Sequence, residues 1–274
     1  MSAPDIAVER AANGRANGLR ALLLNDAAVR IYAGLAIVLV WEIVVRLFAP
    51  PFVARPSGIA VALPAVVMSG AFWDNVGATL AAVFEGLAIA FASGTLVGLA
   101  MGRIRAVDRF FEIYVSGFFA MPMVAILPLI SLWFGYTGAA RLATVVFASF
   151  FSIVVNVADG ARAVPVEFIE VSRAFRGSAI SRILDVILPA SVPYLLAGLR
   201  LAAGRALIGA VVAEFFTAIP GLGYYIVFQA RTFHHNEAFV AVMVLAAAGV
   251  LFEIALRHAT ARFLPWYRRG ERGA

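Results

Sequence analysis

Long runs of hydrophobic residues, separated by short polar breaks, make up most of the chain. Each run is about 20 residues long, the length that an α-helix needs to cross the hydrocarbon core of a bilayer. The breaks contain proline, glycine and clusters of charge, as loops at a membrane surface do. The pattern predicts six membrane-spanning helices, near residues 31–48, 77–101, 113–134, 140–158, 192–217 and 238–256.

The composition places these helices in lipid. Of the 274 residues, 63% are hydrophobic and only 14% are charged, whereas a soluble domain has about 45–50% apolar and about 25% charged residues. No segment between the runs is long enough to form a soluble domain. We therefore expect an all-α integral membrane protein, with a polar tail at 1–30, a six-span membrane domain at 31–266 and a second tail at 267–274.

Two missing residue types restrict the chemistry. The sequence contains no cysteine, and all 22 basic residues are arginine, so lysine is absent as well. Without lysine the chain cannot form a P-loop or a Schiff base with a cofactor, and without cysteine it has no thiolate nucleophile or cysteine zinc site. Only three histidines remain. We expect no catalytic, cofactor-binding or metal-binding residues in this chain, and any ATP hydrolysis belongs to a partner.

The arginines are distributed unevenly between the two sides of the predicted membrane domain. Six spans place both termini on one side, and that side carries sixteen arginines, in the two tails and in the loops after the second and fourth spans. The opposite loops carry only Arg46, Arg55, Arg141 and Arg231. Because arginine is retained on the cytoplasmic side, the termini and the loop at 159–189 are predicted to be cytoplasmic.

The loop at 159–189 has the pattern of two short amphipathic helices. Pro165 suits a first helical position, and the first helix is predicted to end near Gly177. Ser178 is a good N-cap for a second helix, which Pro189 is expected to stop. A structured, partly apolar hairpin of this kind either docks on another protein or lies against the membrane and its own helices.

The residues of this loop resemble the cytoplasmic "EAA" loop of binding-protein-dependent ABC importer permeases. That pattern is Glu-Ala-Ala, three residues, Gly, nine residues, then Ile-x-Leu-Pro, and it is matched by Glu170-Val171-Ser172 and by Leu188-Pro189. The flanking sequence is similar to the sulfonate, nitrate and taurine branch of the family. Further similarity lies in Arg55-Pro-Ser, Thr79-Leu, Leu127-Pro-Leu, Leu132-Trp-Phe-Gly, Gly198-Leu-Arg, Ala213-Glu-Phe-Phe, Gly221-Leu-Gly-Tyr and Pro265-Trp.

One position departs from the family pattern. The glycine expected six residues after Glu170 is Arg176, and the nearest glycine, Gly177, follows one place later. The sequence therefore predicts a helix break shifted by one residue.

The resemblance implies that the loop is a coupling element gripped by a separate ATPase. The implied partners are a second permease copy, two cytosolic ABC ATPase subunits that hold ATP and Mg, an external substrate-binding protein and membrane lipid, with no nucleic acid. The implied coupling residues are Phe168, Glu170, Val171, Arg173, Ala174, Phe175, Gly177, Leu188 and Pro189.

Several features inside the spans are candidates for the translocation pathway. Pro122 and Pro128 disfavour a straight third span, and broken helices commonly line cavities in transporters, although a simple kink is an equal alternative. Buried charges are costly in a membrane, so each needs a partner or a cavity. For Arg205 we weigh attraction of an anionic cargo against pairing with Glu85 or Glu214. The candidate pathway residues are Glu85, Pro122, Met123, Pro128, Arg200, Arg205 and Glu214.

Small residues recur at every fourth position of the second span, from Ala78 to Gly102. Such a stripe lets two helices approach closely, either within the chain or between two permease copies.

The sequence thus predicts a permease subunit that imports a small sulfonate-, taurine- or nitrate-like anion by alternating access. An importer of an aromatic acid or a neutral heterocycle is the alternative within the family. An intramembrane enzyme would need a nucleophile and base that the sequence lacks, and a secondary carrier would need inverted repeats, of which none is convincing.

Overall fold

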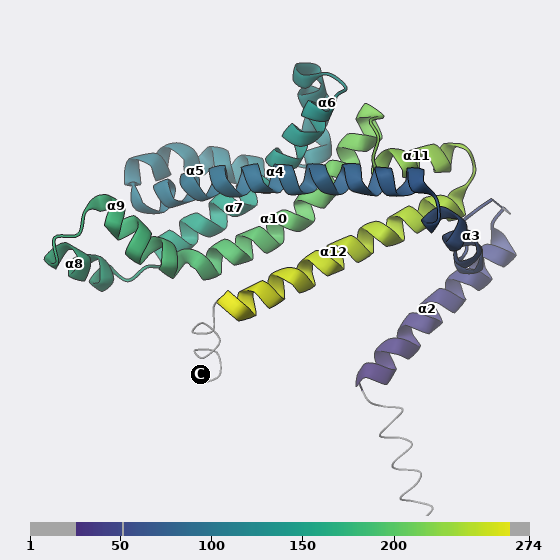
Figure 1. The fold of residues 1–274 in the computed structure, drawn as a ribbon, viewed down its shortest axis with the longest axis horizontal. Helices are drawn as coiled ribbons and strands as arrows, with labels where there is room; N and C mark the ends of the chain where they lie inside the picture. The colour runs from purple at the N-terminus through teal and green to yellow at the C-terminus, as the bar shows by residue number, and fades with distance from the viewer. Residues whose placement is uncertain (1–25, 51, 264–274) are drawn as a thin grey trace, which may run out of the picture. The chain divides into compact units, whose positions relative to one another are not determined.

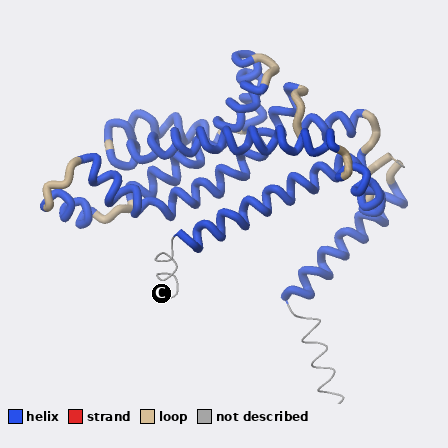
Figure 2. The backbone as a smooth tube through the Cα atoms, viewed as in Figure 1, coloured by secondary structure: helices blue, strands red, loops and turns tan. Residues whose placement is uncertain are grey.

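The computed structural model describes residues 26–50 and 52–263, and all regular structure in them is helical (Figures 1 and 2). The chain divides into two compact units, with the boundary between Pro64 and Ala65. The helices are α2 (Asp26–Phe48), α3 (Pro56–Val67), α4 (Gly70–Arg103), α5 (Arg105–Ala120), α6 (Met123–Phe134), α7 (Gly138–Arg162), α8 (Val166–Ala174), α9 (Ala179–Ser181), the π-helix η1 (Arg182–Ile187), α10 (Leu188–Thr217), α11 (Leu222–Arg231) and α12 (His235–Phe263). The two predicted tails, 1–30 and 267–274, lie wholly or mostly outside the described residues.

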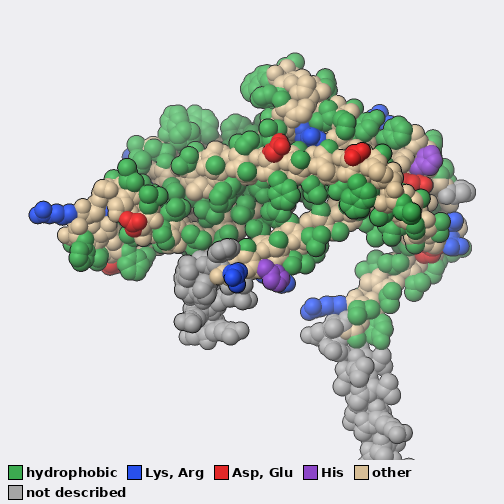
Figure 3. All heavy atoms as spheres, in the orientation of Figure 1, with side chains coloured by type: hydrophobic (Ala, Val, Ile, Leu, Met, Phe, Trp, Pro, Cys, Tyr) green, Lys and Arg blue, Asp and Glu red, His purple; other side chains and the backbone are tan. Residues whose placement is uncertain are grey.

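The described residues contain five helices that are long and apolar enough to cross a membrane, and the bent pair α5–α6 adds a sixth crossing if it counts as one span. Each predicted span corresponds to one of these. Hydrophobic side chains cover most of the visible surface (Figure 3), and large apolar residues such as Leu96 and Val250 are more than half exposed. In water such a surface would be strongly unfavourable, so its natural surroundings are lipid or other membrane helices.

The core of the second unit is a layer of three helices, α4, α7 and α10, in which α7 packs against both of the others. Figure 1 shows these three helices lying side by side. Their contact is made by small and medium apolar residues, including Ala90, Val145, Ile153 and Ala206, which are almost completely buried. Helices α11 and α12 pack against α10 and against each other.

The stripe of small residues on α4 faces α7, so it serves packing within the chain. A Cβ added at Gly86 would lie 2.5 Å from Val145 Cγ1, and one at Gly98 would lie 2.8 Å from the carbonyl oxygen of Val154. Any larger side chain would force the two helices apart. Close approach of backbones replaces the hydrophobic drive that lipid does not supply. The stripe is therefore occupied by α7 and is not free to contact a second permease copy.

The third predicted span is not one continuous helix. It consists of α5 and α6, which meet at an angle of 105° across the break at Met121 and Pro122. Pro122 is the N-cap of α6, whereas Pro128 lies inside α6. Pro122 has no backbone N–H and disfavours the helical conformation in the residue before it, which places the break at this proline. Pro128 does not interrupt α6.

The first unit is held together by Glu42 of α2. Its carboxylate accepts hydrogen bonds from the backbone N–H of Ser57 at 2.9 Å and from the Ser57 hydroxyl at 2.7 Å, and it pairs with Arg46 one turn along α2. Ser57 is the second residue of α3, so Glu42 satisfies one of the N–H groups that the start of a helix leaves unpaired.

Candidate functional site

The segment from the end of α7 to the start of α10 forms a hairpin at one end of the second unit. Helices α8 and α9 project beyond the ends of α7 and α10 (Figure 1). Most of its large side chains are exposed, and Phe175 has 85% of its surface open. We refer to residues 163–187 as the coupling hairpin. Its position outside the helix layer leaves its apolar face available to another molecule.

The base of the coupling hairpin is packed and tied to the helix layer. Ile169 of α8 and Ile187 of η1 are buried against Ala161 and Val164. Arg162, the last residue of α7, pairs with Asp108 of α5 and donates to Asp159 at 2.8 Å. These contacts hold the base while the tip stays open. The sequence analysis did not identify Ile169 as the buried residue of this helix, because several apolar residues surround it and each could lie on the buried face.

Arg103 makes a further tie at this end. Its guanidinium donates a 3.0 Å hydrogen bond to the carbonyl oxygen of Ala161, linking the end of α4 to the last turn of α7. The base of the hairpin is therefore joined to α4, α5 and α7.

The predicted coupling residues lie mostly on the exposed side. Phe168 and Val171 are more than half exposed, and Glu170 and Arg173 are exposed beside them. Pro165 is the N-cap of α8, so the helix begins at Val166, one place after the predicted first helical position. The Ser178 hydroxyl accepts a 3.1 Å hydrogen bond from the backbone N–H of Ser181, as expected of an N-cap.

The first hairpin helix ends at Arg176, where the family pattern has glycine. Arg176 has a φ of 56°, in the left-handed region. The backbone N–H of Gly177 donates to the Ser172 carbonyl at 2.9 Å, and that of Arg176 donates to the Arg173 carbonyl at 2.9 Å. This pair of bonds is a Schellman motif, which ends a helix through one left-handed residue. The break is therefore at position 176, and the predicted shift of one residue was wrong.

Gly177 is required for a different reason. A Cβ at this position would lie 2.9 Å from the Ser172 carbonyl oxygen and 2.7 Å from its hydroxyl. The Gly177 carbonyl also accepts a 2.8 Å hydrogen bond from the Arg182 guanidinium, which closes the turn between α8 and α9. A side chain here would displace the Schellman bond.

The second hairpin helix does not stop at Pro189. It passes through the π-helix η1 directly into α10, and together they form one apolar run from Ala179 to Thr217. A proline ring normally clashes with the carbonyl four residues earlier, which here is Asp185 inside η1. The wider π turn moves that carbonyl away, so the helix continues. Pro189 is thus the second residue of α10 rather than a terminator.

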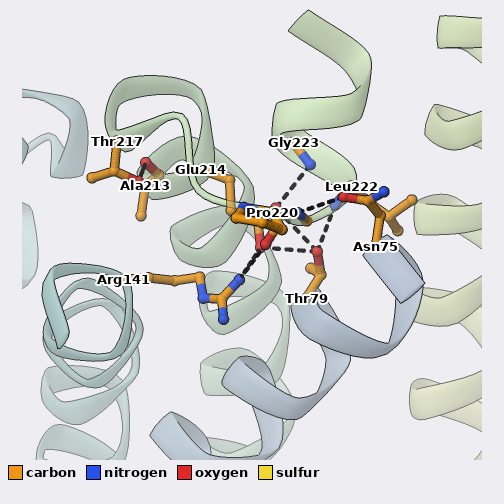
Figure 4. A network of polar contacts seen from close by, with 10 residues as sticks. Asn75, Thr79, Arg141, Ala213, Glu214, Thr217, Pro220, Leu222 and Gly223 are labelled. Atoms are coloured by element: carbon orange, nitrogen blue, oxygen red, sulfur yellow. Dashed lines mark hydrogen bonds and ion pairs between the residues drawn. The ribbon is translucent and has the colours of Figure 1, made fainter. Parts of the chain in front are cut away.

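A buried polar cluster (Figure 4) lies where α10 leads into α11, at the end of the helix layer away from α8 and α9 (Figure 1). The carboxylate of Glu214 in α10 is completely buried. It accepts hydrogen bonds from the Thr79 hydroxyl at 2.9 and 3.0 Å and from the Gly223 backbone N–H at 2.8 Å, and it pairs with Arg141 at 3.1 Å. We call these residues, with Asn75, the Glu214 cluster.

The Glu214 cluster fastens the turn between α10 and α11. Arg141 donates to the Pro220 carbonyl at 2.8 Å, Asn75 accepts from the Gly221 N–H at 2.8 Å, and the Thr79 hydroxyl accepts from the Leu222 N–H at 2.8 Å. A buried charge of this kind is stable only when it is paired and hydrogen-bonded. The cluster joins α4, α7, α10 and α11. The sequence analysis did not identify these partners of Glu214.

Arg205 does not pair with Glu214 or Glu85. Its guanidinium donates a 3.3 Å hydrogen bond to the Phe119 carbonyl, near the end of α5, and its central carbon lies 4.2 Å from the centre of the Phe119 ring. Broken helices leave backbone carbonyls unpaired at membrane depth, so this contact satisfies one of them. Glu85 is exposed on α4 and forms no ion pair with a described residue.

A hollow of about 270 Å³ opens at the break between α5 and α6, beside Arg205. Met123, the first residue of α6, and Phe151 of α7 form part of its wall. We call it the Arg205 hollow. Of the seven predicted pathway residues, Met123 and Arg205 line it and Pro122 is at the break, whereas Glu85, Pro128, Arg200 and Glu214 lie elsewhere.

Arg200 belongs to a separate cavity of about 470 Å³ between α4, α10 and α12. There it pairs with Glu253 of α12 at 3.1 Å, and both side chains are about half exposed. The two charges therefore compensate each other.

Long apolar helices, a broken helix pair and an exposed hairpin tied to the helix layer are typical of a transporter membrane subunit. Residues 94–268 match the family described as the binding-protein-dependent transport system inner membrane component, and the chain belongs to that family. It is a permease subunit of an ABC importer, not an enzyme, as the sequence predicted.

Similar proteins with assigned names are transport permeases. The chain is 29% identical over 236 residues to the formylaminopyrimidine transport permease protein ThiX of Halalkalibacterium halodurans, covering 86% of this chain and 94% of that protein. It is 26% identical to the putative aliphatic sulfonates transport permease protein SsuC of Bacillus subtilis, covering 84% of each. The taurine transport system permease protein TauC of Escherichia coli is 27% identical, covering 81% and 82%.

Solved structures show the same fold. A chain of the MetNI methionine ABC transporter, described as inward facing, matches with a TM-score of 0.61 at 20% sequence identity, covering 72% of this chain and 97% of that one. The likeness extends the family assignment to the arrangement of the helices.

Proposed function

We propose that this permease imports a small organic anion and that the coupling hairpin transmits ATP-driven motion to the helix layer. The observation that carries the proposal is the contrast within the hairpin: its tip presents exposed apolar residues, while its base is tied to α4, α5 and α7. A rigid lever needs such a free contact surface and such a fixed attachment.

The surface of the hairpin suits a protein groove. Phe168, Val171 and Phe175 supply apolar area, and Glu170 and Arg173 are exposed on the same short helix. An amphipathic helix laid in a hydrophobic groove uses this combination of apolar anchors and polar flanks. The partner would be a cytosolic ABC ATPase that holds ATP and Mg, present in two copies.

The full transporter would contain two copies of this permease and an external substrate-binding protein. The arginine asymmetry supports a cytoplasmic hairpin and cytoplasmic termini in the inner membrane. ATP binding would draw the paired hairpins together and switch the helix layers between inward-open and outward-open states, because packed interfaces change between discrete arrangements.

Two substrate classes are supported by the relatives. SsuC and TauC are named for sulfonates and taurine, which fits an anionic cargo attracted by an intramembrane arginine. ThiX is named for a formylaminopyrimidine, which favours a flat heterocycle as the second candidate.

The proposal is tested by exchanging an exposed residue of the hairpin tip. In Phe175→Glu, a charge replaces an exposed apolar contact, so the permease should fold normally but lose the ATPase. We expect co-purification of the ATPase and ATP-driven uptake in proteoliposomes to fall at least about tenfold, as the loss of one buried aromatic anchor predicts.

The matched control is Tyr136→Glu, since Tyr136 is 70% exposed in the turn before α7, at the far end from the hairpin. The Tyr136 variant should retain both ATPase binding and uptake, because it lies far from the hairpin. Full ATPase capture by the Phe175 variant, or equal losses in both variants, would contradict the proposal.

A further inference from the structure

The Arg205 hollow has aromatic walls on one side. The rings of Phe118 and Phe151 are stacked, with centres 5.4 Å apart and planes at 26°. Phe147 meets Phe151 edge-on, with ring centres 5.1 Å apart. All three rings border the hollow. Such rings offer both faces and edges to a flat ligand, the geometry that aromatic groups prefer.

Arg205 is the one charged side chain in the wall of this hollow. Within the described residues no carboxylate pairs with it, and its single hydrogen bond goes to the Phe119 carbonyl. A guanidinium has five N–H donors, so most of them remain available. Near the middle of a span an uncompensated positive charge is costly. An anion in the hollow would remove that cost.

The start of α6 adds to the attraction. Met123, its first residue, lies in the wall of the hollow, and the N-terminal end of a helix carries a partial positive charge. The Arg205 hollow thus combines a guanidinium that has no carboxylate partner and a positive helix end with aromatic walls. Two other arginines of the helix layer, Arg141 in the first turn of α7 and Arg200 in α10, are each paired with a carboxylate.

The size of the hollow limits its ligand. Its volume is about 270 Å³, and an apolar protein cavity of about 150 Å³ is large enough to hold benzene. A single ring with one anionic group therefore fits. A ligand with several negative charges would find only one guanidinium to pair with.

We propose that the Arg205 hollow is a substrate-binding station for a small organic monoanion with a flat, preferably aromatic, body. The anionic group would pair with Arg205, and the ring would stack against the Phe118–Phe147–Phe151 wall. The inference rests on the proposed import function and narrows its cargo class. It separates this permease from carriers of purely inorganic anions, which would gain nothing from three phenyl rings.

The test is direct binding to the purified permease–ATPase complex in nanodiscs, nucleotide-free and trapped with ATP and vanadate. The probes are radiolabelled benzenesulfonate, its neutral analogue benzenesulfonamide, and methanesulfonate, which keeps the charge and lacks the ring. We expect benzenesulfonate to bind at least about tenfold more tightly than either of the other two, in at least one of the two states.

Substitutions separate the charge from the ring. Arg205→Gln should weaken benzenesulfonate binding at least about tenfold and leave benzenesulfonamide binding unchanged, while Arg205→Lys should retain most of the affinity. The control is Arg200→Gln, which removes an arginine from the same helix at the separate α4–α10–α12 cavity. Phe151→Leu should reduce the preference for benzenesulfonate over methanesulfonate, whereas Phe84→Leu, outside the hollow, should not.

Several outcomes overturn the inference. Equal binding of benzenesulfonate and benzenesulfonamide, equal losses in the Arg205 and Arg200 variants, or an unchanged ring preference in Phe151→Leu would each do so. If Arg205→Gln fails to assemble, the wild-type probe series and Arg205→Lys still decide the question. Failure of binding in a complex that captures the ATPase and hydrolyses ATP rejects this inference alone, whereas failure to capture the ATPase rejects the proposed function.

Discussion

The two ends of the helix layer differ in how far their side chains are paired within the chain. At one end, the Glu214 cluster satisfies its own charges: a buried carboxylate, an arginine and three backbone N–H groups are paired with one another. At the other end, the coupling hairpin leaves Phe175 and its neighbours exposed and uses half-exposed ion pairs only at its base. The difference indicates that the first end pairs almost all of its polar groups within the chain, with only Arg141 Nε buried without a hydrogen-bond partner, whereas the second end leaves an apolar surface for a partner.

The comparison predicts the largest effect at Glu214. Glu214→Ala removes the acceptor for Thr79, Gly223 and Arg141 and leaves the arginine without its partner. Breaking a buried ion pair from one side costs about 3–5 kcal/mol, so the purified complex should unfold at a clearly lower temperature. The measurement is thermal unfolding monitored by circular dichroism.

A double substitution checks the cause. Arg141→Ala together with Glu214→Ala should be less damaging than the sum of the single changes, because the two groups interact directly. Additive losses would show that the two residues do not act as a pair. Glu253→Ala, which breaks a half-exposed pair, is the milder control.

A medium effect is expected at Thr79. Thr79→Val keeps the shape of the side chain but removes a donor to Glu214 and an acceptor for the Leu222 N–H. Leaving such buried groups unsatisfied costs about 1–3 kcal/mol. Thr144→Val, whose hydroxyl donates only to the Ala140 carbonyl of its own helix, should cost less. Equal losses in thermal unfolding would argue against a special role for the cluster.

A smaller effect on stability, with a larger one on coupling, is expected at the hairpin base. Arg162→Gln removes the pairs with Asp108 and Asp159, and partly exposed pairs contribute about 0–1 kcal/mol. The looser base should raise the number of ATP molecules hydrolysed per solute imported, because motion of the hairpin is then transmitted less completely. An unchanged ratio in proteoliposomes would mean that the base contacts do not carry the motion.

The smallest effect is expected at Arg176 and has the opposite sign. Arg176→Gly removes a Cβ from a left-handed residue and so relieves a strain of about 1–2 kcal/mol. The greater freedom of glycine in the unfolded chain partly offsets this gain. The hairpin should gain about 0.5 kcal/mol, seen as slower hydrogen exchange of the α8 amides.

The paired control, Arg173→Gly, lies inside α8 and should lose about 1 kcal/mol. Faster exchange in Arg176→Gly would show that the arginine side chain stabilises the turn by a contact of its own.

The membrane helices and the hairpin were predictable because both follow from local pattern. Runs of about 20 apolar residues allow few structures other than a span, and Ser178 caps its helix through atoms three residues apart. The break at Pro122 was also visible, since proline acts on its own turn. Its angle was not, because the packing of α6 sets it.

The sequence-based predictions were wrong where a distant contact or a change of helix type set the local structure. α-Helical geometry alone predicts that Pro189 ends a helix, but the π turn before it moves the carbonyl that the proline ring would meet. Arg176 takes the conformation of the missing glycine because two Schellman bonds hold it there. The small-residue stripe on α4 identifies a close helix contact but not the partner, which is α7.

The amino-acid sequence alone determined that this protein lies in a membrane, where its long apolar helices lie along the chain, and which loop resembles the family's coupling pattern. These features depend on hydrophobicity and on spacing within one or two helical turns. The tertiary structure alone decided which charges are paired, that Glu214 meets Arg141 and Thr79, and that Arg205 faces a hollow without a carboxylate. The contacts of Glu214 with Arg141 and Thr79 join residues 73 and 135 positions apart in the chain, and a local sequence pattern does not indicate which distant side chains will come into contact.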